Sequence, residues 1–157
     1  MKDVVGKFKP EEVLPFAGNG AKVFRGSDGK EYTVYMNSVR YHLFNRSRRC
    51  VCCGLQGTTM VLEYNGNLHR PHFNLYGQLD GIWVLFTKDH VRPKSKGGSN
   101  SFGNMQVMCT FCNSKKKNKE VTIAELRELA VIKNRREQVN KIKRKAKQRR
   151  DGRKNTY

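Results

Sequence analysis

Five cysteines fall into two tight groups, and their spacing is typical of metal ligands. Cys50 and Cys53 lie in the segment CVCCG, and Cys109 and Cys112 lie in the segment CTFC. Two Cys-x-x-Cys pairs supply the four thiolates that tetrahedral structural zinc requires. Cys52 is the spare thiol, because pairing it with Cys50 would give the poorer Cys-x-Cys spacing. The pattern predicts a structural Zn²⁺ ion that joins two distant segments, and the alternative is five reduced thiols without a metal.

A carboxylate and an imidazole stand side by side at the end of an apolar segment. The run IWVLFTKDH ends in Asp89 and His90, and a loop rich in Gly, Ser and Asn follows. An Asp-His pair suits metal-assisted hydrolysis, because the carboxylate can hold a cation while the imidazole takes a proton from water. Taken alone, such a pair is more often a turn with a hydrogen-bonded histidine, so the surrounding sequence has to decide.

Further motif elements follow this pair in a fixed order. They are Pro93, Gly97-Gly98, Asn104 before an apolar strand, Cys109-x-x-Cys112-Asn113 and a lysine cluster. Together with Cys50-x-x-Cys53-Gly upstream, this series resembles the HNH endonuclease family, in the four-cysteine branch common among bacterial and phage proteins. The resemblance covers residues 50–119, which is less than half of the chain.

The resemblance implies a ββα-metal fold and a role for each matching residue. His90 matches the general base that activates water for attack on a phosphodiester. Asp89 matches a ligand of the catalytic divalent cation, and Asn113 completes that site. Asn104 matches the middle Asn of the motif, which holds the loop and orients the base. Since position 113 is Asn rather than His, oxygen ligands favour Mg²⁺ or Mn²⁺ as the catalytic ion.

Strands and a helix have to position these residues, and the sequence predicts them. The turn GSDG indicates a hairpin over residues 21–36, and a short helix follows over 38–44. The segments TMVLEY and HFNLYG predict two strands joined across NGN, and IWVLFTKDH and NMQVMC predict two more. In IWVLFTKDH, alternation predicts Trp83 and Leu85 in the core.

A final helix begins at a capping box. Thr122 and Glu125 form the T-x-x-E pattern, and Val121 and Leu126 occupy the positions of a hydrophobic staple. From residue 133 onward the apolar stripe thins among basic residues, which predicts a nonspecific DNA-binding arm or a solubilising tail.

The expected fold class is α+β. It comprises a ββα-metal (HNH) core stapled by a four-cysteine zinc site, an N-terminal hairpin unit and a basic C-terminal helix. The expected domains are an N-terminal lead-in (1–45), the zinc-stapled nuclease core (46–120) and the basic C-terminal helix and tail (121–157).

The charge indicates a polyanionic partner. The 157 residues carry 32 Lys and Arg against 13 Asp and Glu, a formal net charge of +19. The basic residues nearest the motif are expected to contact DNA phosphates; they are Arg92, Lys94, Lys96, Lys115, Lys116 and Lys117. The sequence has no apolar stretch long enough to span a bilayer, so we expect a soluble protein of a bacterial or phage-infected cytoplasm.

The function expected from the resemblance is metal-dependent DNA cleavage, by nicking or by a double-strand cut. A double-strand cut would need a homodimer or two successive events. The small size suits a phage or mobile-element enzyme, either a homing nuclease or an accessory to a phage or host protein. The alternative is a catalytically silent zinc module that binds nucleic acid. A weaker alternative is an RNA-directed nuclease, although no RNA-recognition motif is present.

Overall fold

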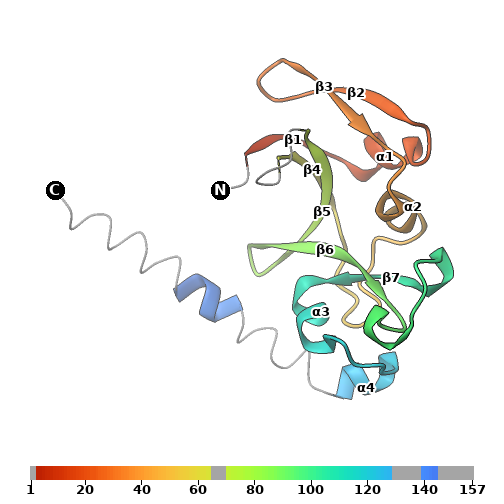
Figure 1. The fold of residues 1–157 in the computed structure, drawn as a ribbon. Helices are drawn as coiled ribbons and strands as arrows, with labels where there is room; N and C mark the ends of the chain where they lie inside the picture. The colour runs from red at the N-terminus through yellow and green to blue at the C-terminus, as the bar shows by residue number, and fades with distance from the viewer. Residues whose placement is uncertain (1–2, 65–69, 129–138, 145–157) are drawn as a thin grey trace.

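The computed structural model describes residues 3–64, 70–128 and 139–144. These residues form a mixed α+β fold, which confirms the expected fold class (Figure 1). The strands are β1 (Val4–Phe8), β2 (Ala21–Arg25), β3 (Glu31–Tyr35), β4 (Thr59–Glu63), β5 (His72–Leu79), β6 (Ile82–His90) and β7 (Met105–Cys109). The α-helices are α1 (Pro10–Val13), α2 (Val39–Arg46), α3 (Thr110–Lys116) and α4 (Ile123–Glu128). The 3₁₀ turns are η1 (Leu14–Phe16), η2 (Lys94–Lys96) and η3 (Phe102–Asn104).

Five strands form one antiparallel sheet in the order β1-β4-β5-β6-β7. The predicted strands TMVLEY and HFNLYG are β4 and β5, and they pair as expected. The NGN segment predicted to join them, residues 65–67, lies outside the described residues. The predicted hairpin forms a separate two-stranded sheet, β2-β3.

Strand β6 pairs with β7, and β7 continues directly into α3 (Figure 1). In this pair Asp89 lies opposite Gln106, and Phe86 lies opposite Cys109. Helix α3 packs against both strands. This β6-β7-α3 unit is the ββα arrangement that the sequence predicted, and it brings the end of β6 under one face of α3.

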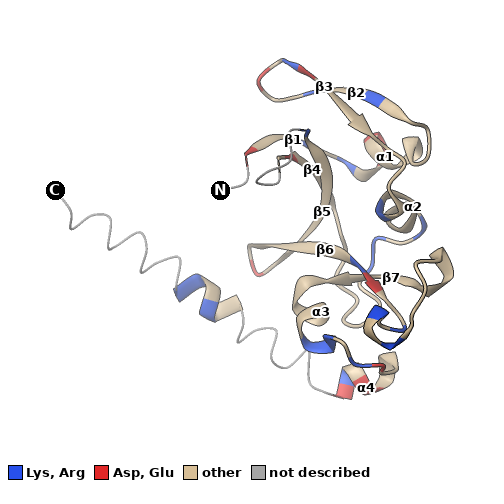
Figure 2. Ribbon diagram, in the orientation of Figure 1, with Lys and Arg blue, Asp and Glu red and all other residues tan. Residues whose placement is uncertain are grey.

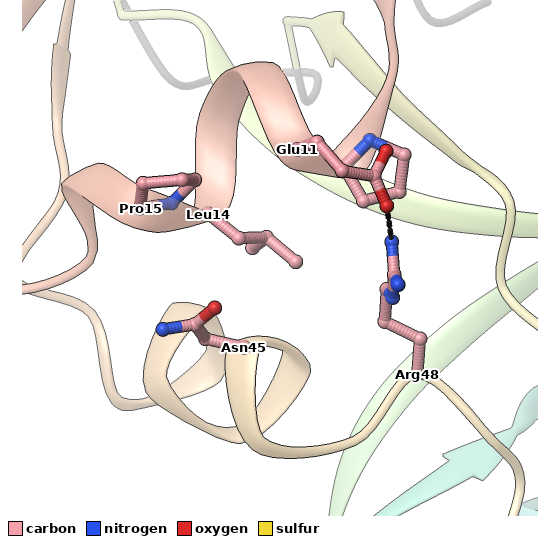
Figure 3. A pocket seen from close by; sticks show the side chains of 6 residues that line it. Glu11, Leu14, Pro15, Asn45 and Arg48 are labelled. Atoms are coloured by element: carbon pink, nitrogen blue, oxygen red, sulfur yellow. Dashed lines mark hydrogen bonds and ion pairs between the residues drawn. The ribbon is translucent and has the colours of Figure 1, made fainter.

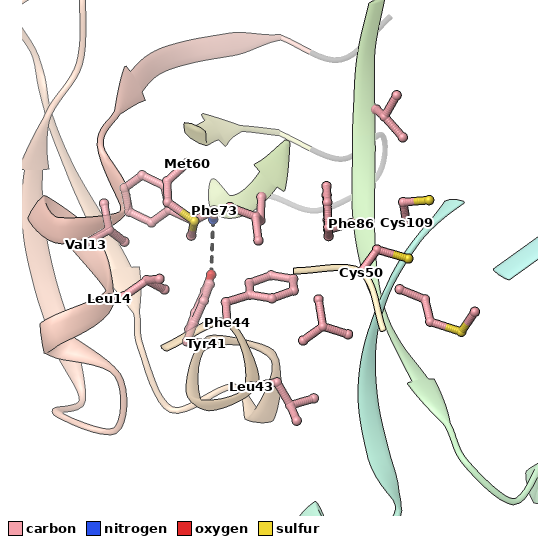
Figure 4. Close-up of a cluster of buried hydrophobic side chains, with 14 of the residues drawn as sticks. Val13, Leu14, Tyr41, Leu43, Phe44, Cys50, Met60, Phe73, Phe86 and Cys109 are labelled. Carbon is pink, nitrogen blue, oxygen red and sulfur yellow. Dashed lines mark hydrogen bonds between the residues drawn. The ribbon is translucent and has the colours of Figure 1, made fainter. Parts of the chain in front are cut away.

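The hydrophobic core lies between the large sheet and the N-terminal helices (Figure 4). Phe73 of β5 donates its backbone N–H to the buried hydroxyl of Tyr41 on α2, at 3.1 Å. The ring of Phe24, from the hairpin, meets Phe73 edge to face at 4.8 Å. Cys50 and Cys109 belong to the same cluster of buried residues. The core therefore continues from the N-terminal elements to the cysteines.

The lead-in segment contributes directly to the large sheet. The sequence did not predict β1, which pairs with β4 at the sheet edge. Glu11 on α1 forms an ion pair with Arg48, just after α2 (Figure 3). These two residues line a hollow of about 180 Å³ between α1 and α2, which contains no residue of the predicted catalytic motif.

The core prediction for Trp83 is wrong. Trp83 is 42% exposed, whereas its neighbours Val84 and Phe86 are buried. In an uninterrupted apolar run, alternation does not tell which set of side chains faces inward, and a shift of one residue exchanges the two faces. The Trp83 ring packs edge to face with Tyr76, and Lys7 Nζ lies 5.0 Å from its centroid.

The predicted capping box forms at the start of α4. The backbone N–H of Glu125 donates to Thr122 Oγ1 at 3.1 Å, and the Thr122 N–H donates to the Glu125 carboxylate at 2.6 Å. Of the tail predicted as a basic helix or arm, residues 139–144 are described and helical, whereas 129–138 and 145–157 lie outside the described residues. Within the described part, no helix is both long and apolar enough to cross a membrane.

Candidate functional site

Asp89 is a nearly buried carboxylate on the face of β6 that meets α3. Its residue exposure is 8%, and its Oδ2 accepts a 2.8 Å hydrogen bond from Gln106 Nε2, directly across the β6-β7 ladder. The same oxygen lies 3.1 Å from Lys116 Nζ. A buried charge needs such partners because it has lost its hydration. Both contacts fall on Oδ2, and among the described residues Oδ1 accepts no hydrogen bond.

Lys116 is the least exposed of the six basic residues near the motif. Its residue exposure is 1%, and its Nζ also donates to the His90 backbone carbonyl at 2.7 Å. It ends α3 and lies one helical turn after Asn113, on the same face. Lys116 thus ties α3 to the end of β6.

His90 is held by a residue of the loop that follows it. Its Nε2 lies 3.0 Å from Asn100 Oδ1. Because an amide oxygen only accepts, His90 donates through Nε2–H, and in the neutral ring the lone pair is on Nδ1. The side chain is half-buried, so the ring remains accessible to a ligand. This tautomer has the free nitrogen that a general base requires.

Asn104 closes the loop between β6 and β7. Its Oδ1 accepts from the Arg92 backbone N–H at 2.9 Å, and its Nδ2 donates to the carbonyls of Arg92 at 3.1 Å and Ser99 at 2.8 Å. Gly98 lies against the same strand end: a Cβ there would come within 1.8 Å of the Arg92 carbonyl oxygen. These contacts fix the segment that carries Asn100.

Asn113 on α3 faces Thr87, two residues before Asp89 on the same face of β6. The Thr87 hydroxyl contacts the Met108 carbonyl at 3.3 Å, where it can only be the donor. Its oxygen is then left to accept from Asn113 Nδ2, at 3.1 Å. Thr87 therefore fixes the orientation of the Asn113 amide. The side-chain oxygen of Asn113, Oδ1, is left for another partner.

These side chains fit a hard divalent cation. Such ions prefer carboxylate and amide oxygens, and Asp89 Oδ1 and Asn113 Oδ1 are the two that the hydrogen bonds above leave uncommitted. Both residues lie where α3 packs against β6. Lys116 of α3 contacts Asp89 of β6, and Asn113 of α3 contacts Thr87 of β6. A cation held by these two oxygens would still be open to water and to substrate, and would supply positive charge for phosphodiester hydrolysis.

The four predicted zinc ligands lie together, and Cys52 is outside the group. The Sγ atoms of Cys50, Cys53, Cys109 and Cys112 all lie within 4.8 Å of one another, and the Cys53–Cys109 pair is 3.8 Å apart. Four sulfurs at about 2.3 Å from one tetrahedral zinc would be about 3.8 Å apart. The four cysteines could therefore hold one zinc ion, whereas Cys52 is buried separately.

The contacts within the cluster move the thiol pKa values in opposite directions, down for Cys50 and Cys53 and up for Cys109 and Cys112. Hydrogen bonds with Cys109 and Cys112 lower the pKa of the Cys50 thiol to about 6. Contacts with the same two thiols hold the pKa of Cys53 well below its usual range. Burial raises the pKa of Cys52, which lies outside the cluster.

The basic residues near the motif gather around the end of β6. Figure 2 shows blue segments at η2, at the end of α3 and after α2, near the red segment of β6. Arg92, Lys94, Lys96 and Lys117 are exposed, and Lys115 is half-buried. Arg92 also lies 3.8 Å from Glu120. We call these five basic side chains the basic rim. Lys116 does not belong to it, because Lys116 is buried and contacts Asp89 and the His90 carbonyl.

Sequence reasoning missed the supporting residues Thr87, Asn100 and Gln106, and the contact of Lys116 with Asp89. The spacing of Thr87 and Asp89 places both on one face of a strand, so that relationship was available. The contact of Gln106 depends on the β6-β7 register, which the sequence does not specify. Lys116 was one of several adjacent lysines, and only helix packing distinguishes it.

Comparison with known proteins points to the same segment. No curated protein and no solved structure matches the chain. One family model matches, and it covers residues 84–123, which hold the end of the sheet, α3 and the whole predicted catalytic motif. Over these residues the chain is similar to the HNH endonuclease family.

Proposed function

We propose that this protein is a divalent-metal-dependent endonuclease that hydrolyses phosphodiester bonds in DNA. The observation that carries the proposal is the β6-β7-α3 unit, which assembles Asp89, His90 and Asn113 with their hydrogen-bond partners. The family match over residues 84–123 supports the same reaction.

His90 is the proposed general base. Its Nδ1 takes a proton from a water whose oxygen attacks the scissile phosphorus, while Asn100 holds Nε2–H. The P–O3′ bond breaks, leaving a 5′-phosphate, and the 3′ oxygen takes a proton from solvent. Asp89 and Asn113 supply ligand oxygens for Mg²⁺ or Mn²⁺. A bound divalent ion stabilises negative charge on the phosphate and on the leaving oxygen.

The remaining predicted residues have supporting roles in this proposal. Asn104 fixes the loop that carries Asn100. The zinc cysteines hold the start of α3, since Cys112 directly precedes Asn113. The exposed members of the basic rim contact phosphates on either side of the cut. The described residues form one such site, so we expect a single chain to nick one strand.

Plasmid nicking tests the proposal. Wild-type protein should convert supercoiled plasmid to the open-circular form in Mg²⁺ or Mn²⁺ and stop in chelator. His90→Ala should lower the rate by about 10²- to 10⁴-fold, the usual contribution of a general base. Arg70→Ala is a matched control, since Arg70 lies over the Tyr35 ring and outside the motif. DNA binding without cleavage in every metal would reject the proposal.

A silent binding module is the second candidate, and one observation favours it. The Asp89–Lys116 ion pair satisfies the carboxylate without a metal. Under this reading the protein binds DNA through its basic rim, and neither wild type nor His90→Ala cuts. The same plasmid assay separates the two candidates.

A further inference from the structure

The Asp89–Lys116 contact places a fixed positive charge beside the proposed divalent-cation site. Lys116 Nζ is 3.1 Å from Asp89 Oδ2, and both residues are buried, at 1% and 8% exposure. Charges shielded from water interact far more strongly than charges at the surface. The ammonium group therefore opposes a second cation at this carboxylate.

Among the described residues, no second carboxylate forms an ion pair or a hydrogen bond with Asp89 or Lys116. Gln106 and Asn113, which are also near the site, are neutral amides. The carboxylate of Asp89 and the ammonium of Lys116 thus leave the immediate surroundings with no net charge.

Lys116 is also fixed in place. Its Nζ donates to the His90 carbonyl at 2.7 Å, and its side chain is enclosed between α3 and β6. Leaving the site would expose this carbonyl and break the ion pair. The charge of Lys116 is therefore a permanent feature of the site rather than a mobile surface charge.

We propose that Lys116 makes binding of the divalent cation depend on DNA. The protein alone binds the cation weakly, because its ligand set has no net negative charge. A DNA phosphate supplies the missing negative charge, so cation and DNA bind cooperatively at this site. This inference rests on the proposed function, and it assigns Lys116 as a positioning residue that suppresses metal binding in the absence of substrate.

Mn²⁺ binding tests the inference without measuring cleavage. The free Mn²⁺ signal in electron paramagnetic resonance is titrated with the His90→Ala protein, with and without a DNA duplex. The same titration with Asp89→Asn gives the background from ions bound by DNA alone. We expect Mn²⁺ to bind about 10- to 100-fold more tightly when DNA is present, within the usual range of coupling between two ligands.

Replacing the charged Lys116 side chain should remove most of the dependence of Mn²⁺ binding on DNA. In the His90→Ala background, Lys116→Met should bind Mn²⁺ about 10-fold more tightly without DNA and gain little from its addition. Lys88→Met is the control, since Lys88 is exposed on β6 and, as the neighbour of Asp89 in the strand, lies on the opposite face. A folded Lys116→Met protein whose Mn²⁺ affinity is unchanged or weaker overturns the inference.

The outcomes remain decisive if Lys116→Met does not fold. In that case equal Mn²⁺ affinity with and without DNA in the His90→Ala protein overturns the inference, and cooperative binding supports it. Wild-type plasmid cleavage is recorded in parallel. Cleavage without cooperative Mn²⁺ binding rejects the inference alone, whereas absence of both cleavage and Mn²⁺ binding rejects the proposed function.

Discussion

Cys112 and Asn113 are neighbours on the first turn of α3, and they point into two different sites. The Cys112 thiol lies in the four-cysteine cluster, and the Asn113 amide donates to Thr87 on β6. A metal that fixes Cys112 therefore also fixes the position of the proposed catalytic amide. A zinc ion held by the four cysteines would thus support the proposed active site without taking part in its chemistry.

Loss of one zinc ligand should disable both sites. Cys53→Ala is expected to purify without zinc, to unfold at lower temperature and to lose cleavage, because a structural zinc needs all four thiolates. Zinc per chain, measured by mass spectrometry, and thermal unfolding followed by circular dichroism check this.

Cys52→Ala is the matched control for the cysteine variant. Cys52 is more deeply buried than Cys53, yet it lies outside the four-thiol cluster. It should keep one zinc per chain and show only the modest instability of a small cavity. Folded wild-type protein that contains no zinc would contradict the prediction.

The hydroxyl group of Thr87 should affect metal affinity and nicking more than the shape of its side chain does. Thr87→Val keeps the volume and removes the hydroxyl that orients the Asn113 amide. Changes to groups that orient metal ligands typically cost about 10- to 100-fold in metal affinity or activity, and we expect a loss in that range. Thr87→Ser keeps the hydroxyl and should retain most activity. Equal nicking rates and Mn²⁺ affinities for the Val and Ser variants would show that Asn113 is oriented by other contacts.

Asn104 should stabilise the loop between β6 and β7. Asn104→Ala removes three hydrogen bonds to Arg92 and Ser99, so we expect a loss of about 1–3 kcal/mol in the free energy of unfolding. Hydrogen exchange should become faster in residues 91–103, and nicking should slow. Asn118→Ala, at an exposed position after α3, is the control. Unchanged exchange in this loop would refute the proposed role.

The turn of the β2-β3 hairpin gives a prediction about pH. Tyr32 donates its hydroxyl to Asp28 at 2.7 Å, and this hydrogen bond raises the pKa of Tyr32 from 10.0 to about 12. Because the folded pKa is raised, the contribution to stability is complete below pH 10.0 and is lost as the pH rises towards about 12. The difference in phenolate absorbance between wild type and Tyr32→Phe measures this titration. Asp28→Asn should move it back towards the ordinary value, and an unchanged titration would contradict the assignment.

Local sequence signals were sufficient for most elements. The GSDG turn predicted the hairpin because Asp28 accepts the Lys30 backbone N–H and Gly29 adopts a φ of +78°. The capping box predicted the start of α4 because both of its hydrogen bonds form within one turn of helix. Such features depend on residues close together in the chain, so the sequence specifies them directly.

Features that depend on packing between distant segments were harder to predict. Strand β1 has five residues, and no turn-forming sequence marks it as a strand. It is a strand because its backbone pairs with β4. Likewise, the contacts of Lys116 and Gln106 with Asp89 follow from the β6-β7 register and the position of α3. The motif predicted the members of the site, whereas only the fold shows which side chains hold them.

The contact between His90 and Asn100 predicts a single histidine tautomer. Because Asn100 Oδ1 accepts from Nε2–H, nitrogen chemical shifts of the neutral His90 ring should show the proton on Nε2 and a bare Nδ1. Asn100→Ala removes the acceptor, so the two tautomers should mix, and cleavage should fall about 10-fold or more because part of the population lacks the free Nδ1. Ser101→Ala is the neighbouring control, since its hydroxyl contacts Ser99 and not His90. An Asn100→Ala protein that keeps both the single tautomer and the full nicking rate would show that another group holds His90.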